Sequence, residues 1–162
     1  MRNAMTGVNM VLGAALLALV LATAAAPSAA PAQVTVTEAW ATPPLVAGRP
    51  LAAYLTLVNP GPEEAVLVGA ETPIAKRAAI HTHSRENGVV RMRAAGPVTI
   101  PAGGEVRFQP GGLHLMLFDP NPGLVSGTTF PLHLRFGDGT SLDTRVTVRP
   151  LGWHSGAASR RD

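Results

Sequence analysis

The sequence predicts an all-β fold, either a two-sheet sandwich or a Greek-key barrel of about nine short strands. From Gln33 onward, short segments alternate apolar and polar residues, as half-buried strands do. Glycine and proline, with 17 and 15 residues, fall in nearly every interval between these segments and are typical of turns. No stretch repeats apolar residues at helical spacing over the length of a helix. The chain is apolar enough to bury one core, so we expect one domain at residues 33–150.

Five strands are expected in the first half of this domain. The first alternates cleanly and ends before a proline-rich loop, and the turn signal Asn59-Pro60-Gly61-Pro62 stops the second. Asn87-Gly88 is typical of a tight hairpin turn between the fourth and the fifth. The expected ranges are 34–40, 52–59, 66–70, 78–83 and 89–92.

The second half continues in the same way, and glycine, proline or aspartate separates its strands. The expected ranges are 98–100, 106–109, 113–118, 130–136 and 142–149. We find no internal repeat and no domain break. Residues 151–162 are small and polar, so we expect a disordered tail there.

Residues 1–32 have the layout of a secretory signal peptide. Arg2 gives a positive start, residues 8–26 are apolar, and Ala-x-Ala sites stand at 24–26 and 30–32. The alternative is an uncleaved membrane anchor, because the apolar run nearly has the length that spans a bilayer. No cysteine lies near the cleavage sites, which excludes a lipoprotein anchor. We therefore expect cleavage and export.

Charge and cysteine content exclude several classes of function. The net charge is +3 and the basic residues, all Arg except Lys76, are scattered, so we expect no nucleic-acid partner. Without cysteine the chain has no thiol nucleophile, no Cys-x-x-Cys redox pair and no blue-copper site. The few acidic residues form no cleft motif, and Ser84 belongs to no nucleophile elbow. We therefore expect that the protein is not an enzyme.

Four side chains that bind soft or borderline metals stand at fixed intervals. His81 is followed by Met92 after ten residues, then by His114 after twenty-one more, and Met116 stands one residue further on. Thioether sulfur is soft and uncharged and selects Cu(I) over Zn, Mg or Ca, while imidazole suits copper in either oxidation state. The set therefore suits Cu(I) where thiols would be oxidised.

Strand alternation places two of these side chains together. In 113–118 three leucines share the face that we assign to the core, so His114 and Met116 project from the opposite face. Taken alone, this pair is equally well interpreted as a strand-edge methionine and an ordinary surface imidazole.

The segment 80–83 repeats this geometry, with His81 and His83 on one face and Ile80 on the other. The Asn87-Gly88 turn would bring Met92 back beside that strand. Between two arginines, however, Met92 taken alone is better interpreted as a core residue.

The remaining histidines are poorer ligand candidates. His133 lies between two leucines and is expected to face solvent, and His154 lies in the expected tail. Neither has a ligand-type partner nearby in the sequence.

The joint pattern resembles the periplasmic copper chaperones of the PCuAC family. All four ligand positions are filled by the expected residue types. The last two, His114 and Met116, lie in the segment Gly111-Gly112-Leu113-His114-Leu115-Met116-Leu117. Similar stretches also occur at 53–61, 80–83, 88–93 and 100–104. The resemblance covers about Val34 to Val148.

The resemblance implies a cupredoxin-like Greek-key β-sandwich that presents Cu(I) at its surface, bound by His81, Met92, His114 and Met116. It also implies delivery of copper in the periplasm to the CuA centre of cytochrome c oxidase, directly or with a Sco-type thiol protein. We expect a monomer without a small-molecule substrate. The chain departs from members that have a His- and Met-rich C-terminal extension, because only His154 follows Pro150. His83 lies outside the motif and remains an auxiliary candidate.

Two other functions stay open on the sequence. One is copper sequestration or resistance, which would use the same four ligands without a dedicated acceptor. The other is a metal-free β-sandwich interaction module in which the methionines and histidines are incidental.

Overall fold

The computed structural model describes residues 34–46 and 48–153, which form ten β-strands and no helix. The expected signal peptide at 1–32 and most of the expected tail lie outside these residues. The strands are β1 Thr35–Ala41, β2 Leu51–Val58, β3 Ala65–Glu71, β4 Ala75–Glu86, β5 Val89–Ala94, β6 Val98–Ile100, β7 Glu105–Arg107, β8 His114–Pro120, β9 Thr129–Phe136 and β10 Ser141–Val148. None of the described residues forms a helix that could cross a membrane.

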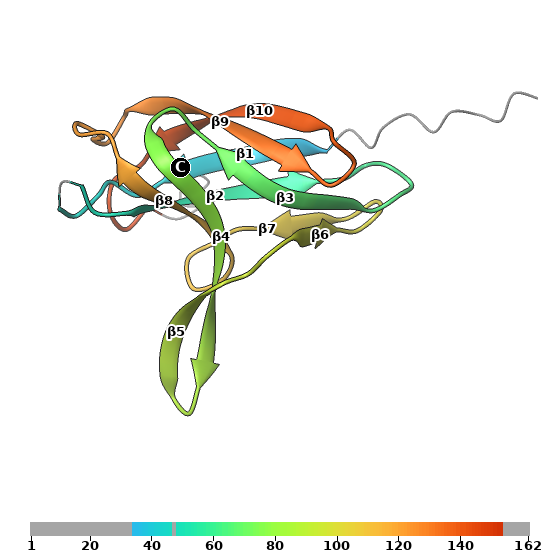
Figure 1. Ribbon diagram of the computed structural model, residues 1–162, viewed down its shortest axis with the longest axis horizontal. Coiled ribbons are helices and arrows are strands. Elements are labelled where there is room, and N and C mark those ends of the chain that lie inside the picture. Colours follow the sequence, from blue (N-terminus) through green and yellow to red (C-terminus); the bar gives the residue numbers. More distant parts are fainter. Residues whose placement is uncertain (1–33, 47, 154–162) are drawn as a thin grey trace, which may run out of the picture. The chain divides into compact units, whose positions relative to one another are not determined.

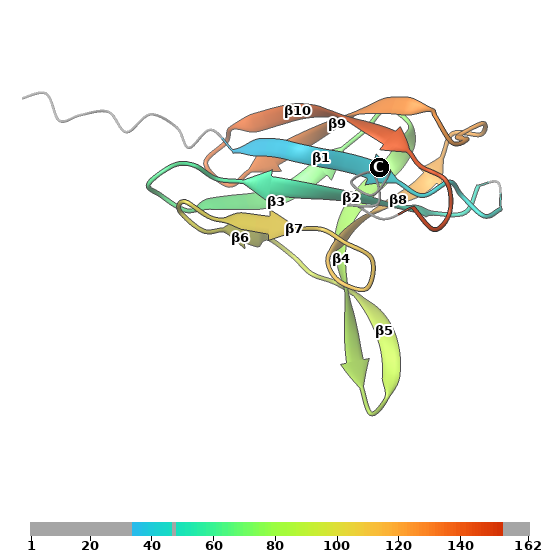
Figure 2. The ribbon, with the colours of Figure 1, turned by 180° about the vertical axis from the view of Figure 1, so that it is seen from behind.

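The strands are hydrogen-bonded in the order β5-β4-β8-β2-β1-β10-β9-β3-β6, and β7 pairs with residues 56–58 of β2 (Figure 1, and from behind in Figure 2). Strand β1 joins the two halves of this path, because it is antiparallel to β2 and parallel to β10. The predicted all-β class is confirmed, and each of the ten expected ranges overlaps one of the ten strands.

The core lies between these two halves. Strand β9 alternates strictly, with Phe130, Leu132, Leu134 and Phe136 buried and the residues between them more exposed. These side chains belong to one buried cluster with the inward leucines of β2 and β8. Fully burying a Leu or Phe side chain is worth about 1.5–3 kcal/mol, which makes this cluster the main stabilising element. The two halves therefore form the layers of a sandwich.

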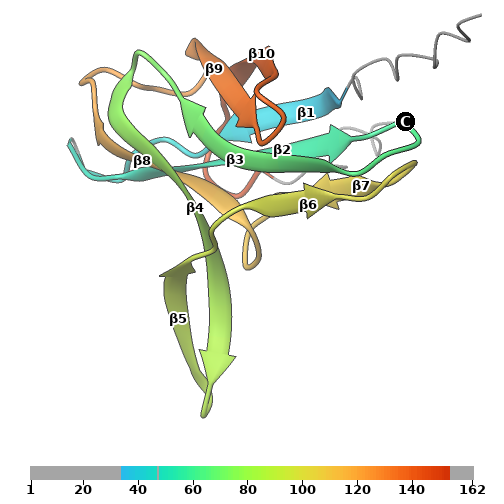
Figure 3. The ribbon, with the colours of Figure 1, turned by 45° about the vertical axis from the view of Figure 1, so that its right-hand side comes forward.

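Strands β4 and β5 form a hairpin that extends away from the sandwich (Figure 3). Residues 75–81 of β4 pair with β8, and residues 81–86 pair with β5. Asn87 and Gly88 both have positive φ, 49° and 81°, as a type I′ turn requires. The predicted hairpin is thus present, but β4 is longer than the expected range 78–83. The two ends of β4 are polar, so no alternation of apolar residues marks them as strand in the sequence.

Ordered packing continues past Pro150. The ring of Trp153 lies 4.8 Å from that of Trp40 in an edge-on contact, and the Arg149 guanidinium lies 5.1 Å from the Trp153 ring. The rest of the expected tail, residues 154–162, lies outside the described part of the chain.

Candidate metal centre

The cross-strand register places all four predicted ligands on one face of β5, β4 and β8. His81 lies opposite His114 across β4 and β8, and Met116 follows His114 by two residues. His83 follows His81 by two residues and lies opposite Met92 across β4 and β5. Residues directly opposite each other, and residues two apart in one strand, point to the same side of a sheet.

The other face of β8, and of the part of β4 that pairs with β8, is the core. Leu115 and Leu117 are fully buried, and Ile80 is nearly so. The parity argument that set the leucines of β8 against His114 and Met116 is therefore confirmed.

His114 is the most enclosed residue of the group, with only 2% of its surface exposed, so the interpretation as an ordinary surface imidazole is wrong. Its Nδ1 lies 3.0 Å from the Gly112 carbonyl oxygen, and its Nε2 lies 3.1 Å from the Met92 sulfur. Donation by Nδ1–H to the carbonyl leaves Nε2 with a free lone pair. The Met92 thioether has no hydrogen to offer it.

Nε2 and the Met92 sulfur are thus two electron-pair donors aimed at one point. In a tetrahedral site with bond lengths like those of zinc, a nitrogen and a sulfur ligand stand about 3.5 Å apart. The separation of 3.1 Å is close to that value. The pair is arranged as two ligands of one soft cation would be.

Met92 lies on the hairpin with 46% of its surface exposed. The interpretation of Met92 as a core residue is therefore wrong. All six residues of β5 are exposed, because the hairpin extends beyond the sandwich and has no core beneath it. The position of Met92 therefore depends on the hairpin turn.

Met116 is half-buried between two small residues. Its cross-strand neighbours are Ala52 on β2 and Ala79 on β4. Alanine on both sides leaves the long, flexible thioether side chain room to turn toward His114.

His83 joins this cluster although the four-residue motif omits it. Its ring stacks on that of His114, with centroids 4.9 Å apart and planes inclined by 28°, while the His81 and His114 centroids are 6.0 Å apart. The Nδ1 atoms of His81 and His83 are both buried without a hydrogen-bond partner. Buried polar atoms are normally paired, so these nitrogens are available for a ligand.

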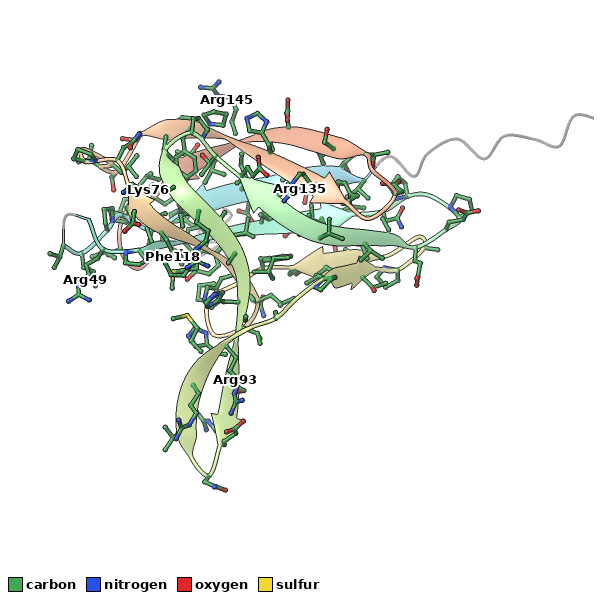
Figure 4. The ribbon with its side chains drawn as sticks, in the orientation of Figure 1. Arg49, Lys76, Arg93, Phe118, Arg135 and Arg145 are labelled. Carbon is green, nitrogen blue, oxygen red and sulfur yellow. The ribbon has the colours of Figure 1, made fainter. Side chains whose placement is uncertain are left out.

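Aromatic rings border the group, and the sequence analysis missed them. The Tyr54 ring lies 6.5 Å from that of His114, and the Phe118 ring lies 5.8 Å from that of His81. The ring of Phe118, which is labelled in Figure 4, in turn lies under the Arg77 guanidinium, whose Cζ is 3.8 Å from the ring centroid. Phe118 shares the parity of His114 and Met116 in the expected strand, which is the signal that could have found it.

Burial and neighbouring groups favour the neutral form of His81 and His114 by lowering the pKa of each. Burial lowers the pKa of His114, the nearby His83 and His81 lower it further, and the hydrogen bond to Gly112 partly opposes them. Burial, and then the positive charge of Arg77, lower the pKa of His81. A neutral imidazole can bind a metal, whereas an imidazolium cannot.

Within residues 34–46 and 48–153, no group of three or more His, Cys, Asp or Glu side chains could hold an ion. The methionine sulfurs are the further donors that the candidate centre offers beside its histidines.

His133 is exposed, as predicted, but it has a partner that the sequence analysis missed. Its Nδ1 lies 2.6 Å from a carboxylate oxygen of Asp143, its cross-strand neighbour on β10. It lies on β9 and takes no part in the cluster on β4, β5 and β8. His154 lies outside the described residues.

Residues 34–148 match the family model described as LpqE-like. The chain belongs to the LpqE-like family. This LpqE-like chain is 33% identical over 118 residues to "Putative lipoprotein Lxx21020" of Leifsonia xyli subsp. xyli, which covers 72% of this chain and 69% of that protein.

Solved structures resemble the LpqE-like chain as well. The Cu(I) form of DR1885 from Deinococcus radiodurans is 32% identical, with a TM-score of 0.57, covering 76% of this chain and 81% of that one. The copper-bound PCuAC domain from PmoF2 has a TM-score of 0.62 at 17% identity, over 76% and 96% of the two chains, and bears on the fold alone. The predicted PCuAC-type family and cupredoxin-like sandwich are confirmed.

Proposed function

We propose that this protein binds one Cu(I) ion through His81, Met92, His114 and Met116 and passes it to another protein. The observation that carries the proposal is the approach of the His114 Nε2 to the Met92 sulfur at 3.1 Å, with no proton between them. The Cu(I) form of DR1885, which is 32% identical to this chain, supports copper as the cargo.

The ligand set explains why the cargo would be Cu(I). Two thioethers and two neutral imidazoles add no negative charge, which disfavours Mg²⁺, Ca²⁺ and other hard cations. The proton on the His114 Nδ1 fixes the ring through Gly112, so that Nε2 is presented to the metal in one orientation. The aromatic rings of Tyr54 and Phe118 reduce access of water to the same face.

The unequal exposure of the ligands supports transfer over storage. His114 is buried and held by a backbone carbonyl, whereas Met92 is exposed on the hairpin. An incoming ligand could therefore displace the Met92 thioether while His114 still holds the ion, so that copper never becomes free. A thiolate acceptor binds Cu(I) more strongly than a thioether, which gives the transfer its direction.

The proposal also covers the compartment in which the protein works and the protein that accepts its copper. The signal-peptide layout of residues 1–32 and the lipoprotein designation of the Leifsonia relative support export to the periplasm. We place the CuA centre of cytochrome c oxidase, or a Sco-type thiol protein, as the acceptor. Deleting a chaperone lowers oxidase activity at low copper, whereas deleting a sequestering protein raises sensitivity at high copper, and this comparison tests the assignment.

The ligand assignment is tested by replacing Met116 with Leu. Leucine fills nearly the same volume, so the denaturation midpoint should change little, while loss of one sulfur should weaken Cu(I) binding at least about tenfold. Affinity is measured anaerobically by competition with a chromogenic Cu(I) chelator. Unchanged competition by a folded Met116→Leu protein would remove Met116 from the site.

A further inference from the structure

A pocket of about 260 Å³ opens along the β4–β5 hairpin, next to the candidate copper site. We call it the hairpin pocket, and it is lined by His83, Ser84, Arg85, Val90 and Gly111. His83 lies opposite Met92, and Gly111 precedes the glycine whose carbonyl holds His114. Whatever enters the hairpin pocket therefore comes close to the exposed copper ligand.

The polar groups of the hairpin pocket lack partners. The His83 Nδ1 and the Ser84 hydroxyl are buried without a hydrogen bond, and with the His81 Nδ1 they are the only such side-chain atoms among the described residues. Arg85 makes no ion pair in the described part of the chain, whereas Arg93, Arg107 and Arg135 each contact a glutamate. Because buried polar atoms are normally satisfied, the pocket is complementary to an external hydrogen-bonding group.

The charge of the hairpin defines the kind of group. Residues 83–94 contain three arginines, Arg85, Arg91 and Arg93, and one acidic residue, Glu86. Both carboxylate oxygens of Glu86 lie 2.7 Å from Arg93, shown on the hairpin in Figure 4, so Glu86 is not available to the other two. Arg85 and Arg91 thus make no ion pair among the described residues. Arg85 lies opposite Val90, on the face of His83 and Met92, whereas Arg91 lies opposite Ser84 on the other face. The guanidinium group of Arg85 is therefore the one available at the hairpin pocket, and such a group binds a carboxylate in a two-pronged geometry.

Apolar surface accompanies these charges. Val90, which lies opposite Arg85 and lines the hairpin pocket, is 54% exposed. Exposed apolar side chains rimmed by charge are typical of protein interaction surfaces. A protein segment accounts for both features, because a small inorganic anion would leave Val90 uncovered.

We propose that the hairpin pocket receives a carboxylate side chain from an acidic segment of the protein with which this chain exchanges its metal. Docking at Arg85, on the same face of the hairpin as Met92, would hold the partner beside Met92 before any ligand is exchanged, and the positive charge of Arg91 adds to the attraction. That the partner exchanges copper rests on the proposed function, whereas recognition of an acidic segment rests on the hairpin alone.

The test is an NMR titration of the copper-free, full-length protein with hexaglutamate. Backbone amide shifts are expected at residues 83–92 and 110–112, and they should weaken as salt screens the charges. The R85E/R91E double variant should bind at least about tenfold more weakly. R145E is the matched control, since Arg145 on β10 also makes no ion pair among the described residues, and it should bind as the wild type does.

Several results would overturn this proposal. They are the absence of hairpin shifts, equal shifts with hexalysine, an equal loss in R145E, or binding to vesicles rich in anionic phospholipid without binding to hexaglutamate. Because the protein is copper-free, each result stands whether or not the protein binds Cu(I).

A second measurement connects the hairpin pocket to copper. Cu(I) transfer from the loaded protein is followed to bicinchoninate, which carries carboxylates, and to biquinoline, the same ring system without them. R85E/R91E should slow transfer to bicinchoninate about five- to tenfold at low salt and leave transfer to biquinoline unchanged. Equal slowing of both would instead mean that the arginines shape the copper site, and would overturn docking.

Discussion

His114 is the residue on which the candidate site depends, because each of its ring nitrogens has a separate task. Nδ1 is held by the Gly112 carbonyl, and Nε2 faces the Met92 sulfur. Its ring is also covered on one side by His83. A residue so enclosed contributes to stability as well as to binding.

The two buried contacts of His114 predict a large effect of its removal. His114→Ala leaves a cavity and an unpaired Gly112 carbonyl, and should lower the free energy of unfolding by about 1–3 kcal/mol. His133→Ala is the matched control at an exposed position, and should change it by less than about 0.5 kcal/mol. Urea denaturation of the two metal-free variants measures both values. Equal effects would mean that the contacts of His114 do not hold the fold.

At the scale of single residues, strand parity could be predicted and burial could not. The leucines of β8 fix which way His114 and Met116 point, because side chains alternate along a strand. The enclosure of His114 depends on Tyr54 from β2 and on His83 and Met92 from the hairpin, which no local pattern brings together. For the same reason the sequence favoured a core position for Met92.

At the scale of elements, the β4–β5 hairpin decides whether Met92 reaches the site. It has no core beneath β5, so its geometry depends on its register with β4 and on its turn. Gly88 has a φ of 81°, a conformation that costs other L-residues about 1–2 kcal/mol, and an added Cβ would meet no atom within 4 Å. A substitution at Gly88 therefore disturbs the backbone conformation of the turn and creates no steric clash.

Gly88→Ala should therefore loosen the hairpin and weaken Cu(I) binding, while the unfolding midpoint of the sandwich changes little. Gly88→Asn is the matched control, because asparagine tolerates positive φ, and it should bind nearly as tightly as the wild type. Competition against a chromogenic chelator and amide exchange in β5 provide the two readouts. If the alanine and asparagine variants bind Cu(I) equally, the turn does not position Met92.

The elements themselves were largely predictable where apolar alternation marks them. Strand β9 shows this best, since its four inward side chains alternate with more exposed ones. The ends of β4 escaped prediction because residues such as Lys76 and Arg85 continue a strand by backbone pairing alone. The crossover of β1 between the two layers was also hidden, since the pairing of distant strands leaves no local signal.

At the scale of the whole molecule, the lowered pKa values of His81 and His114 predict destabilisation by acid. Above the ordinary imidazole pKa of 6.5, His81 and His114 are neutral in the folded and in the unfolded chain, so they give the stability no dependence on pH. As the pH falls below about 6.5, the unfolded chain binds protons that the folded chain does not, so stability declines until the folded pKa values are passed. Neutral imidazoles should also keep Cu(I) bound to a lower pH than an ordinary histidine would.

This prediction is tested by measuring the urea concentration at the midpoint of unfolding of the metal-free protein, from about pH 7.5 to pH 5. The midpoint should decline below about pH 6.5, and the decline should be smaller in His114→Asn than in the wild type. The surface variant His133→Asn controls for an unrelated histidine. A midpoint that rises as the pH falls would have the opposite sign and would contradict the burial of His114.

The central claim is that four side chains from β4, β5 and β8 bind one Cu(I), and an anaerobic Cu(I) titration of the protein tests it most directly. We predict saturation at one ion per chain for the wild type, and weaker binding, by at least about tenfold, for Met92→Leu, whose exposed position makes the substitution harmless to the fold. No stoichiometric binding by the wild type, or the same affinity in Met92→Leu, would contradict the account.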